Sequence, residues 1–162
     1  MKPVVLVLFR TRERDKEILE SILSDTSRVT YFRDISTDKL SRILQDVVVL
    51  MTGSGRDITV QLISKMPKLQ FIQTLSAGLD YVPFDIIPDN VIVASNAGGN
   101  ARAVAEYALA LILDALKKIS MRDRYMRCGI WLRKIPCRLL KDKIVGILGL
   151  GNVGSHLAIM LK

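Results

Sequence analysis

Short apolar runs alternate with amphipathic stretches through the first 98 residues. Between the runs, apolar residues recur at steps of three and four, as at Ile18, Leu19, Ile22 and Leu23, which is typical of a helix with one buried face. Strands that are apolar throughout and separated by such helices indicate a parallel sheet covered on both sides. We therefore predict an α/β domain with a flavodoxin-like parallel sheet over residues 1–98, whose strands comprise residues 4–9, 29–32, 47–51, 69–74 and 91–94.

A different pattern begins at residue 99. Turn-forming residues at 96–100 end in Asn100, a residue type that favours the first position of a helix. Glu106 is the only charged residue between positions 103 and 113, so the segment is apolar nearly all round. We predict one long helix from Ala101 to about Ile119, buried between two bodies.

The rest of the chain, up to residue 162, completes the second predicted region, 99–162. Periodicity is weak over residues 121–140, where we expect a loop or a short broken helix. Residues 143–148 are apolar enough to predict another strand, which would begin a nucleotide-binding domain.

Six residues after this predicted strand have the spacing G-x-G-x-x-G and precede a helical pattern. In such a turn the first glycine allows the tight bend, the second lets a pyrophosphate approach the backbone, and the third lets helix and strand pack closely. We predict a dinucleotide site formed by Gly149, Gly151, Asn152, Val153 and Gly154. The alternative is a glycine turn that serves packing alone.

The spacing does not separate NAD from NADP. The acidic residue that holds the ribose is expected about 20 residues beyond the turn, which is past Lys162. NAD is the expected cofactor, and NADP is left open as the alternative.

Composition excludes several other classes of protein. The apolar fraction of 49% supports a folded core, no apolar run approaches the length of a membrane span, and the basic N-terminus lacks a cleavage site, so we expect a cytoplasmic protein. Cys128 and Cys137, separated by eight residues, and one histidine do not make a metal set. The net charge of +8 falls in residues 117–143, which hold ten Lys/Arg and two Asp. Without a recognition motif this charge makes nucleic-acid binding an unfavoured hypothesis.

Four stretches together resemble the D-isomer-specific 2-hydroxyacid dehydrogenases: residues 69–80, 100–110, 127–131 and the glycine turn. The resemblance runs from end to end of the chain. It implies a substrate-side domain followed by the start of a Rossmann NAD-binding domain, so that the chain is the truncated first half of such an enzyme. It also implies an oxidoreductase that interconverts a small 2-hydroxy acid and its 2-oxo acid, and we expect a homodimer.

The same resemblance implies the binding residues. Backbone amides of Ser76, Ala77 and Gly78 would hold the substrate carboxylate, Ala77 would also lie beside the nicotinamide, and Val104 would contact the cofactor. Ser54 and Gly55 would help to hold the substrate through an anion-binding turn, the alternative being a plain strand-to-helix loop. Phosphoglycerate-type members carry an arginine where this sequence has Gly53, which favours a small acid such as glycerate, glyoxylate or lactate.

Catalysis in the family uses a His/Glu pair and an arginine, all of which the resemblance places beyond the glycine turn. We therefore expect residues 1–162 to contain no catalytic residue and to be inactive alone. His156 lies just after the turn and is expected on a helix surface, and Glu106 is expected to pair with Arg102 four residues earlier or to be a buried structural acid. The alternative function is a non-catalytic binding or dimerisation module derived from the family.

Overall fold

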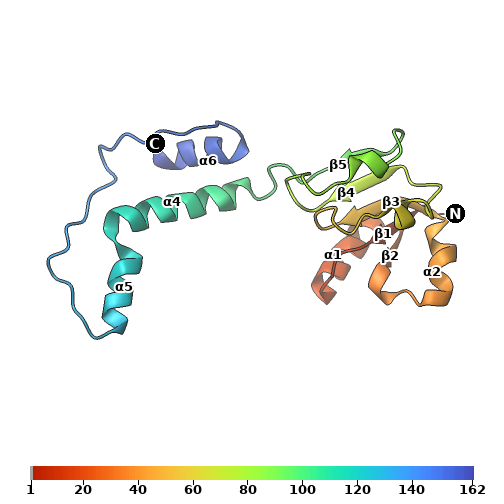
Figure 1. Cartoon of the computed structure of the whole chain (residues 1–162), viewed down its shortest axis with the longest axis horizontal. Coiled ribbons are helices and arrows are strands. Elements are labelled where there is room, and N and C mark those ends of the chain that lie inside the picture. Colours follow the sequence, from red (N-terminus) through yellow and green to blue (C-terminus); the bar gives the residue numbers. More distant parts are fainter. Residues whose placement is uncertain (1) are drawn as a thin grey trace. The chain divides into compact units, whose positions relative to one another are not determined.

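A computed structural model describes residues 2–162 (Figure 1). The chain forms two compact units that divide between Ala97 and Gly98. Within the described residues, no helix is both long and apolar enough to cross a membrane.

The first unit contains a five-stranded, fully parallel sheet with the strand order β2-β1-β3-β4-β5. This order confirms the prediction of a flavodoxin-like sheet. Helices α1 and α2 flank strands β1 and β2 from opposite sides (Figure 1). In chain order the elements are β1 (Val4–Val7), α1 (Glu13–Leu23), β2 (Arg28–Tyr31), η1 (Phe32–Asp34), α2 (Thr37–Leu44), β3 (Val47–Thr52), α3 (Val60–Ile63), β4 (Phe71–Thr74), η2 (Phe84–Ile86) and β5 (Ile92–Ala94).

The apolar runs become central strands because neighbouring strands align their largest aliphatic side chains. Leu6 is paired in register with Leu50, and Leu50 with Ile72, so one buried row crosses three strands. All three side chains are fully buried. Burial of one such side chain contributes roughly 1.5–3 kcal/mol to folding. The row fixes the register of β3 and β4, and with it the position of the loops that leave these two strands.

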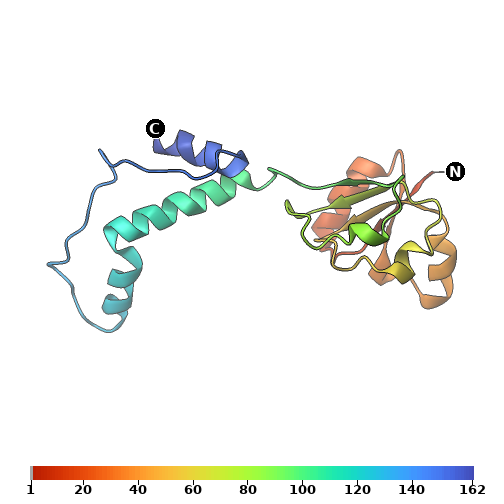
Figure 2. The ribbon, with the colours of Figure 1, turned by 45° about the horizontal axis from the view of Figure 1, so that its top comes forward.

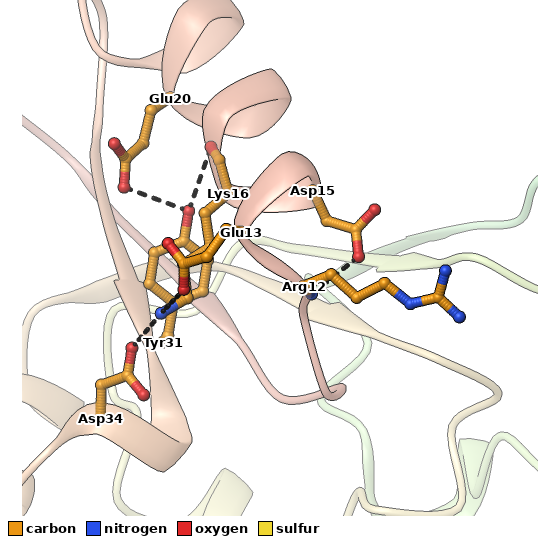
Figure 3. Close-up of polar contacts among 7 residues, drawn as sticks. All are labelled: Arg12, Glu13, Asp15, Lys16, Glu20, Tyr31 and Asp34. Atoms are coloured by element: carbon orange, nitrogen blue, oxygen red, sulfur yellow. Dashed lines mark hydrogen bonds and ion pairs between the residues drawn. The ribbon is translucent and has the colours of Figure 1, made fainter.

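A charged cluster joins α1 to β2 and η1 (Figure 3). The ammonium Nζ of Lys16 donates to Asp34 at 2.8 Å, lies 3.6 Å from Glu13 and sits 5.0 Å from the centre of the Tyr31 ring. The hydrogen bond to Asp34 raises the pKa of Lys16. The Tyr31 hydroxyl donates to Glu20, and its pKa is raised by burial first and by Glu20 second. The contacts of this cluster are all within the protein, and their role is to orient α1 on the sheet.

The second unit contains α4 (Ala101–Lys117), α5 (Ile119–Arg127) and α6 (Asn152–Leu161). Helix α6 lies alongside α4 in both views (Figures 1 and 2). Asn100 precedes α4 as predicted, although its side chain makes no capping hydrogen bond. The predicted long helix ends at Lys117, because Lys118 adopts a left-handed conformation with φ of 59°.

The predicted burial of this helix between two bodies is not seen within residues 98–162. Among its residues only Ala101 and Ala105 are buried, one turn apart, whereas Tyr107 is 67% exposed and Leu111 is 52% exposed. Within residues 98–162, α6 runs along α4 and α5 meets its end, so most of the circumference of α4 is left uncovered.

The prediction of a strand over residues 143–148 is wrong. These residues form no strand, and Ile144 and Leu148 are fully exposed. A strand requires a hydrogen-bonded neighbour, and residues 98–162 contain no other strand to pair with it.

The segment 121–140 is a short helix followed by irregular chain, as predicted. Helix α5 ends at Arg127, and the following loop is held by Arg122, whose guanidinium donates to the carbonyls of Leu132 at 3.1 Å and Ile135 at 3.0 Å. The Cys137 thiol donates to the carbonyl of Lys117 at 3.1 Å, and both cysteines are free. Arg122, one of the basic residues of segment 117–143, therefore stabilises the loop that follows α5.

Asp114 connects α4 to α5 across the break at Lys118. Its carboxylate accepts hydrogen bonds of 2.6 Å from both the amide and the hydroxyl of Ser120, in the first turn of α5. These bonds stabilise the charged form and lower the pKa of Asp114.

A lowered pKa in the folded state makes a stability contribution that is present above the ordinary aspartate pKa and lost as the pH falls through the folded value. We expect acid titration to disorder the start of α5 with a midpoint below the ordinary aspartate value, and Asp114→Asn to remove that step. The amide resonance of Ser120, followed by NMR against pH, measures it. A midpoint at or above the ordinary value would contradict the assigned role.

Candidate functional site

Two buried threonines anchor the loops that leave β3 and β4. Thr52 and Thr74 are paired in register at the ends of these strands and are fully buried. The Thr52 hydroxyl oxygen accepts from the Gly55 amide at 3.2 Å, and the Thr74 hydroxyl donates to the Ser76 carbonyl at 3.0 Å. Since the strands are parallel, both loops lie at the carboxyl edge of the sheet, where α/β folds bind ligands.

The two loops are also bonded to each other. The amide of Leu75 donates to the carbonyl of Thr52, and the amide of Ser76 donates to the carbonyl of Gly53, both at 2.9 Å. The Ser76 amide is therefore not free to bind a substrate, contrary to the expectation from the sequence. The backbone donors that remain in this turn are the amides of Ala77 and Gly78. Among residues 2–162 these two amides have no protein acceptor.

The loop after β3 makes a close backbone approach at Gly55. This residue has φ of +90°, and a Cβ atom built on it would lie 2.7 Å from Val82 Cγ2 and 3.1 Å from Val82 Cα. Gly55 is therefore required by both its conformation and its contact. The amides of Gly53 and Ser54 make no hydrogen bond to any described residue, so this turn presents two further donors.

Two further residues lie on these loops and were not predicted from the sequence. The Arg56 guanidinium carbon sits 3.7 Å from the centre of the Tyr81 ring, a cation–π contact. At an exposed site such a contact contributes about 0.5–1 kcal/mol. The sequence signal that could have identified Arg56 is its position two residues after Ser54. Its contact with Tyr81 could not be predicted, because that contact depends on the pairing of β3 with β4.

The glycine turn of the second unit meets the three steric requirements of its spacing. Gly149 has φ of +93°, which suits a glycine in a tight bend. A Cβ on Gly154 would collide with the Gly149 carbonyl oxygen and lie 3.3 Å from Ile147 Cγ2, so a side chain there would push α6 off the turn. A Cβ built on Gly151 would face open space, with no heavy atom within 4 Å.

Helix α6 begins directly at this turn. Gly151 is its N-cap and Asn152 its first residue, so the amides of Asn152 and Val153 belong to its first turn. Free amides and the helix dipole at such a terminus favour an anion. The side chain of Asn152 also packs against Gly98, where a Cβ would lie 3.0 Å from the Asn152 amide nitrogen.

The other residues singled out in the second unit are on helix surfaces. His156 is exposed on α6. Glu106 lies 3.4 Å from Arg102 in an exposed i,i+4 ion pair, as one of the two expected alternatives had it. Val104 is 41% exposed on α4. In the part of the chain that the structure describes, no three His, Cys, Asp or Glu side chains gather as a metal site would require.

Residues 5–155 match the family described as D-isomer specific 2-hydroxyacid dehydrogenase, catalytic domain. The chain belongs to this family. Among its relatives is the glyoxylate/hydroxypyruvate reductase HPR3 of Arabidopsis thaliana. The two are 37% identical over 115 residues, which cover 67% of this chain and 35% of that protein. The D-3-phosphoglycerate dehydrogenase of Archaeoglobus fulgidus is 32% identical over 126 residues, which cover 76% of this chain and 24% of that protein.

Solved structures of the family share the fold. A glycerate dehydrogenase related protein from Thermoplasma acidophilum is 30% identical, with a TM-score of 0.63 over 98% of this chain and 50% of that one. The D-lactate dehydrogenase of Aquifex aeolicus, solved with NAD and lactic acid, is 22% identical, with a TM-score of 0.76 over 97% of this chain and 47% of that one. The chain thus spans about half the length of these solved relatives and about a third or less of the two curated relatives.

Proposed function

We propose that this chain supplies the substrate-binding loops and the dinucleotide-binding turn of an NAD-dependent oxidoreductase that interconverts a small D-2-hydroxy acid and its 2-oxo acid. The observation that carries the proposal is the family match over residues 5–155, which includes both the carboxyl-edge loops and the glycine turn. The relatives' names, glyoxylate/hydroxypyruvate reductase and D-3-phosphoglycerate dehydrogenase, support this substrate class.

In this proposal the substrate carboxylate accepts hydrogen bonds from the amides of Ala77 and Gly78, with the turn at Ser54 and Gly55 as a second wall. These amides are free donors at the carboxyl edge, as are those of Gly53 and Ser54 in the neighbouring turn. Charge-assisted hydrogen bonds to a carboxylate are stronger than neutral ones. Ser76 shapes the turn, because its hydroxyl donates to the Gly78 carbonyl at 2.8 Å. Ala77, exposed and small, would contact the nicotinamide.

The glycine turn fits a dinucleotide pyrophosphate. The open space at Gly151 leaves room for the phosphates, and the amides of Asn152 and Val153 would donate to them. Gly149 and Gly154 hold the turn in that shape, and Val104 would contact the cofactor. When bound, the nicotinamide supplies a hydride acceptor or donor for the hydroxyl-bearing carbon. NAD is the cofactor proposed, with NADP as the alternative.

We also propose that the chain forms a homodimer. The uncovered side of α4 supports this, since it presents Tyr107 and Leu111 to solvent, and Trp131, in the loop after α5, is 68% exposed. Exposed apolar surface of this kind is typical of a protein–protein interface.

The binding roles are tested by titrating the ¹⁵N-labelled 162-residue protein with NAD. We expect resonances of Gly151, Asn152 and Val153 to shift with a Kd of about 1 mM or weaker, equivalent to roughly 4 kcal/mol, because these residues offer the pyrophosphate amides without a second strand to hold the ribose. Gly151→Val should abolish the shifts by filling the open space, and Gly146→Ala, at another open position, should not. Shifts that persist in Gly151→Val would contradict the site, and micromolar binding lost in Gly151→Val would show that the turn alone is a working site.

A further inference from the structure

Arg56 and Tyr81 present an unpaired guanidinium beside the substrate-binding loops. Arg56 is exposed and stacks on the ring of Tyr81 at 3.7 Å. Because the ring contacts the face of the guanidinium, the N–H donors in the guanidinium plane remain available. Among the described residues Arg56 has no ion pair, whereas Arg102 and Arg127 each contact a carboxylate four residues away.

The position of this pair is fixed relative to the free amides. Gly55, just before Arg56, makes the close backbone contact with Val82, just after Tyr81. The bond from the Ser76 amide to the Gly53 carbonyl ties the same two loops together a second time. The guanidinium and the amides of Ala77 and Gly78 therefore belong to one doubly tethered pair of loops.

A negative charge on these loops makes the guanidinium important to a ligand that carries a second anionic group. A carboxylate oxygen of Asp80 lies 2.7 Å from the position that a Cβ would take on Gly78. This carboxylate stands beside the amides proposed to receive the substrate and repels a doubly charged anion more strongly than a singly charged one. Arg56 is the opposing charge carried by the same loops.

Resting on the proposed function, we propose that Arg56 selects 2-hydroxy and 2-oxo acids that carry a second carboxylate. The amides of Ala77 and Gly78 receive the carboxylate next to the hydroxyl-bearing carbon, and Arg56 receives the distal one. A planar guanidinium fork matches a carboxylate in two parallel hydrogen bonds. This revises the expectation drawn from Gly53, because the loop carries its arginine three residues later.

The test compares D-lactate with D-malate, which differ by the distal carboxylate, in NMR titrations of the 162-residue protein followed at Ala77 and Gly78. We expect D-malate to bind about tenfold more tightly, equivalent to roughly 1.4 kcal/mol. Arg56→Gln should bring the two affinities together while leaving D-lactate binding within about twofold. The control Arg42→Gln removes an exposed guanidinium from α2 and should keep the preference.

The outcomes separate this inference from the function on which it rests. If D-lactate shifts Ala77 and Gly78 but D-malate binds no more tightly, or if Arg56→Gln keeps the preference, the inference is overturned and the proposed function stands. If neither acid shifts these amides, both fall. A larger gain from D-glycerate to D-3-phosphoglycerate than from D-lactate to D-malate would overturn the choice of a carboxylate in favour of a phosphate.

Discussion

The 162-residue polypeptide by itself is expected to show no turnover of glyoxylate, hydroxypyruvate or pyruvate with NADH. The family's chemistry requires a proton donor at the substrate oxygen, and positioned acid–base groups accelerate such steps by about 10²–10⁴-fold. The chain has one histidine, His156, which is exposed on α6. The loops after β3 and β4 offer amides, hydroxyls and Arg56, none of which replaces a His/Glu pair. Loss of NADH absorbance, measured on rigorously purified protein, checks the prediction.

The variant His156→Ala distinguishes intrinsic activity from a contaminating enzyme. Turnover that survives purification and disappears in His156→Ala would overturn the surface role given to this histidine. The matched control is Glu106→Gln, which removes an exposed member of the ion pair with Arg102 and should leave any measured rate unchanged.

The sheet could be predicted because its signal is local. The strands of the first unit are short and rich in apolar residues, and apolar residues between them recur at helical spacing. All five strands therefore lie within or next to the predicted runs. The glycine turn could also be predicted from local sequence. Gly149 is required by its positive φ, and Gly154 is required by its close contact with Gly149, only five residues earlier in the chain. Family resemblance added the functional roles, which the spacing alone does not supply.

The errors arose where structure depends on partners distant in the chain. Residues 143–148 have the composition of a strand but lack a neighbour, and α4 has the composition of a buried helix but is covered along one side. The Ser76 amide was expected to be free, yet the carbonyl of Gly53 on the adjacent loop takes it. Arg56 meets Tyr81 for the same reason, through the pairing of β3 with β4. In each case the missing information was which segments lie side by side.

Gly55→Ala is expected to lower the free energy of unfolding of the first unit by about 2–4 kcal/mol, the sum of left-handed backbone strain and overpacking against a neighbour. The neighbour cannot yield easily, because the new Cβ would lie 3.1 Å from Val82 Cα and 3.2 Å from Val82 N, which are backbone atoms.

Gly53→Ala is the matched control from the same loop. Its Cβ would make an ordinary contact of 3.7 Å with Phe9 Cβ, and Gly53 has no positive φ, so we expect a change within about 1 kcal/mol. Amide hydrogen exchange at buried strand positions such as Ile72 measures the first unit apart from the second. The same spectra should show Arg56 and Tyr81 displaced in Gly55→Ala, because the contact of Gly55 with Val82 is the tether next to both residues. Equal stability of the two variants would mean that the approach of Gly55 to Val82 does not organise the carboxyl edge.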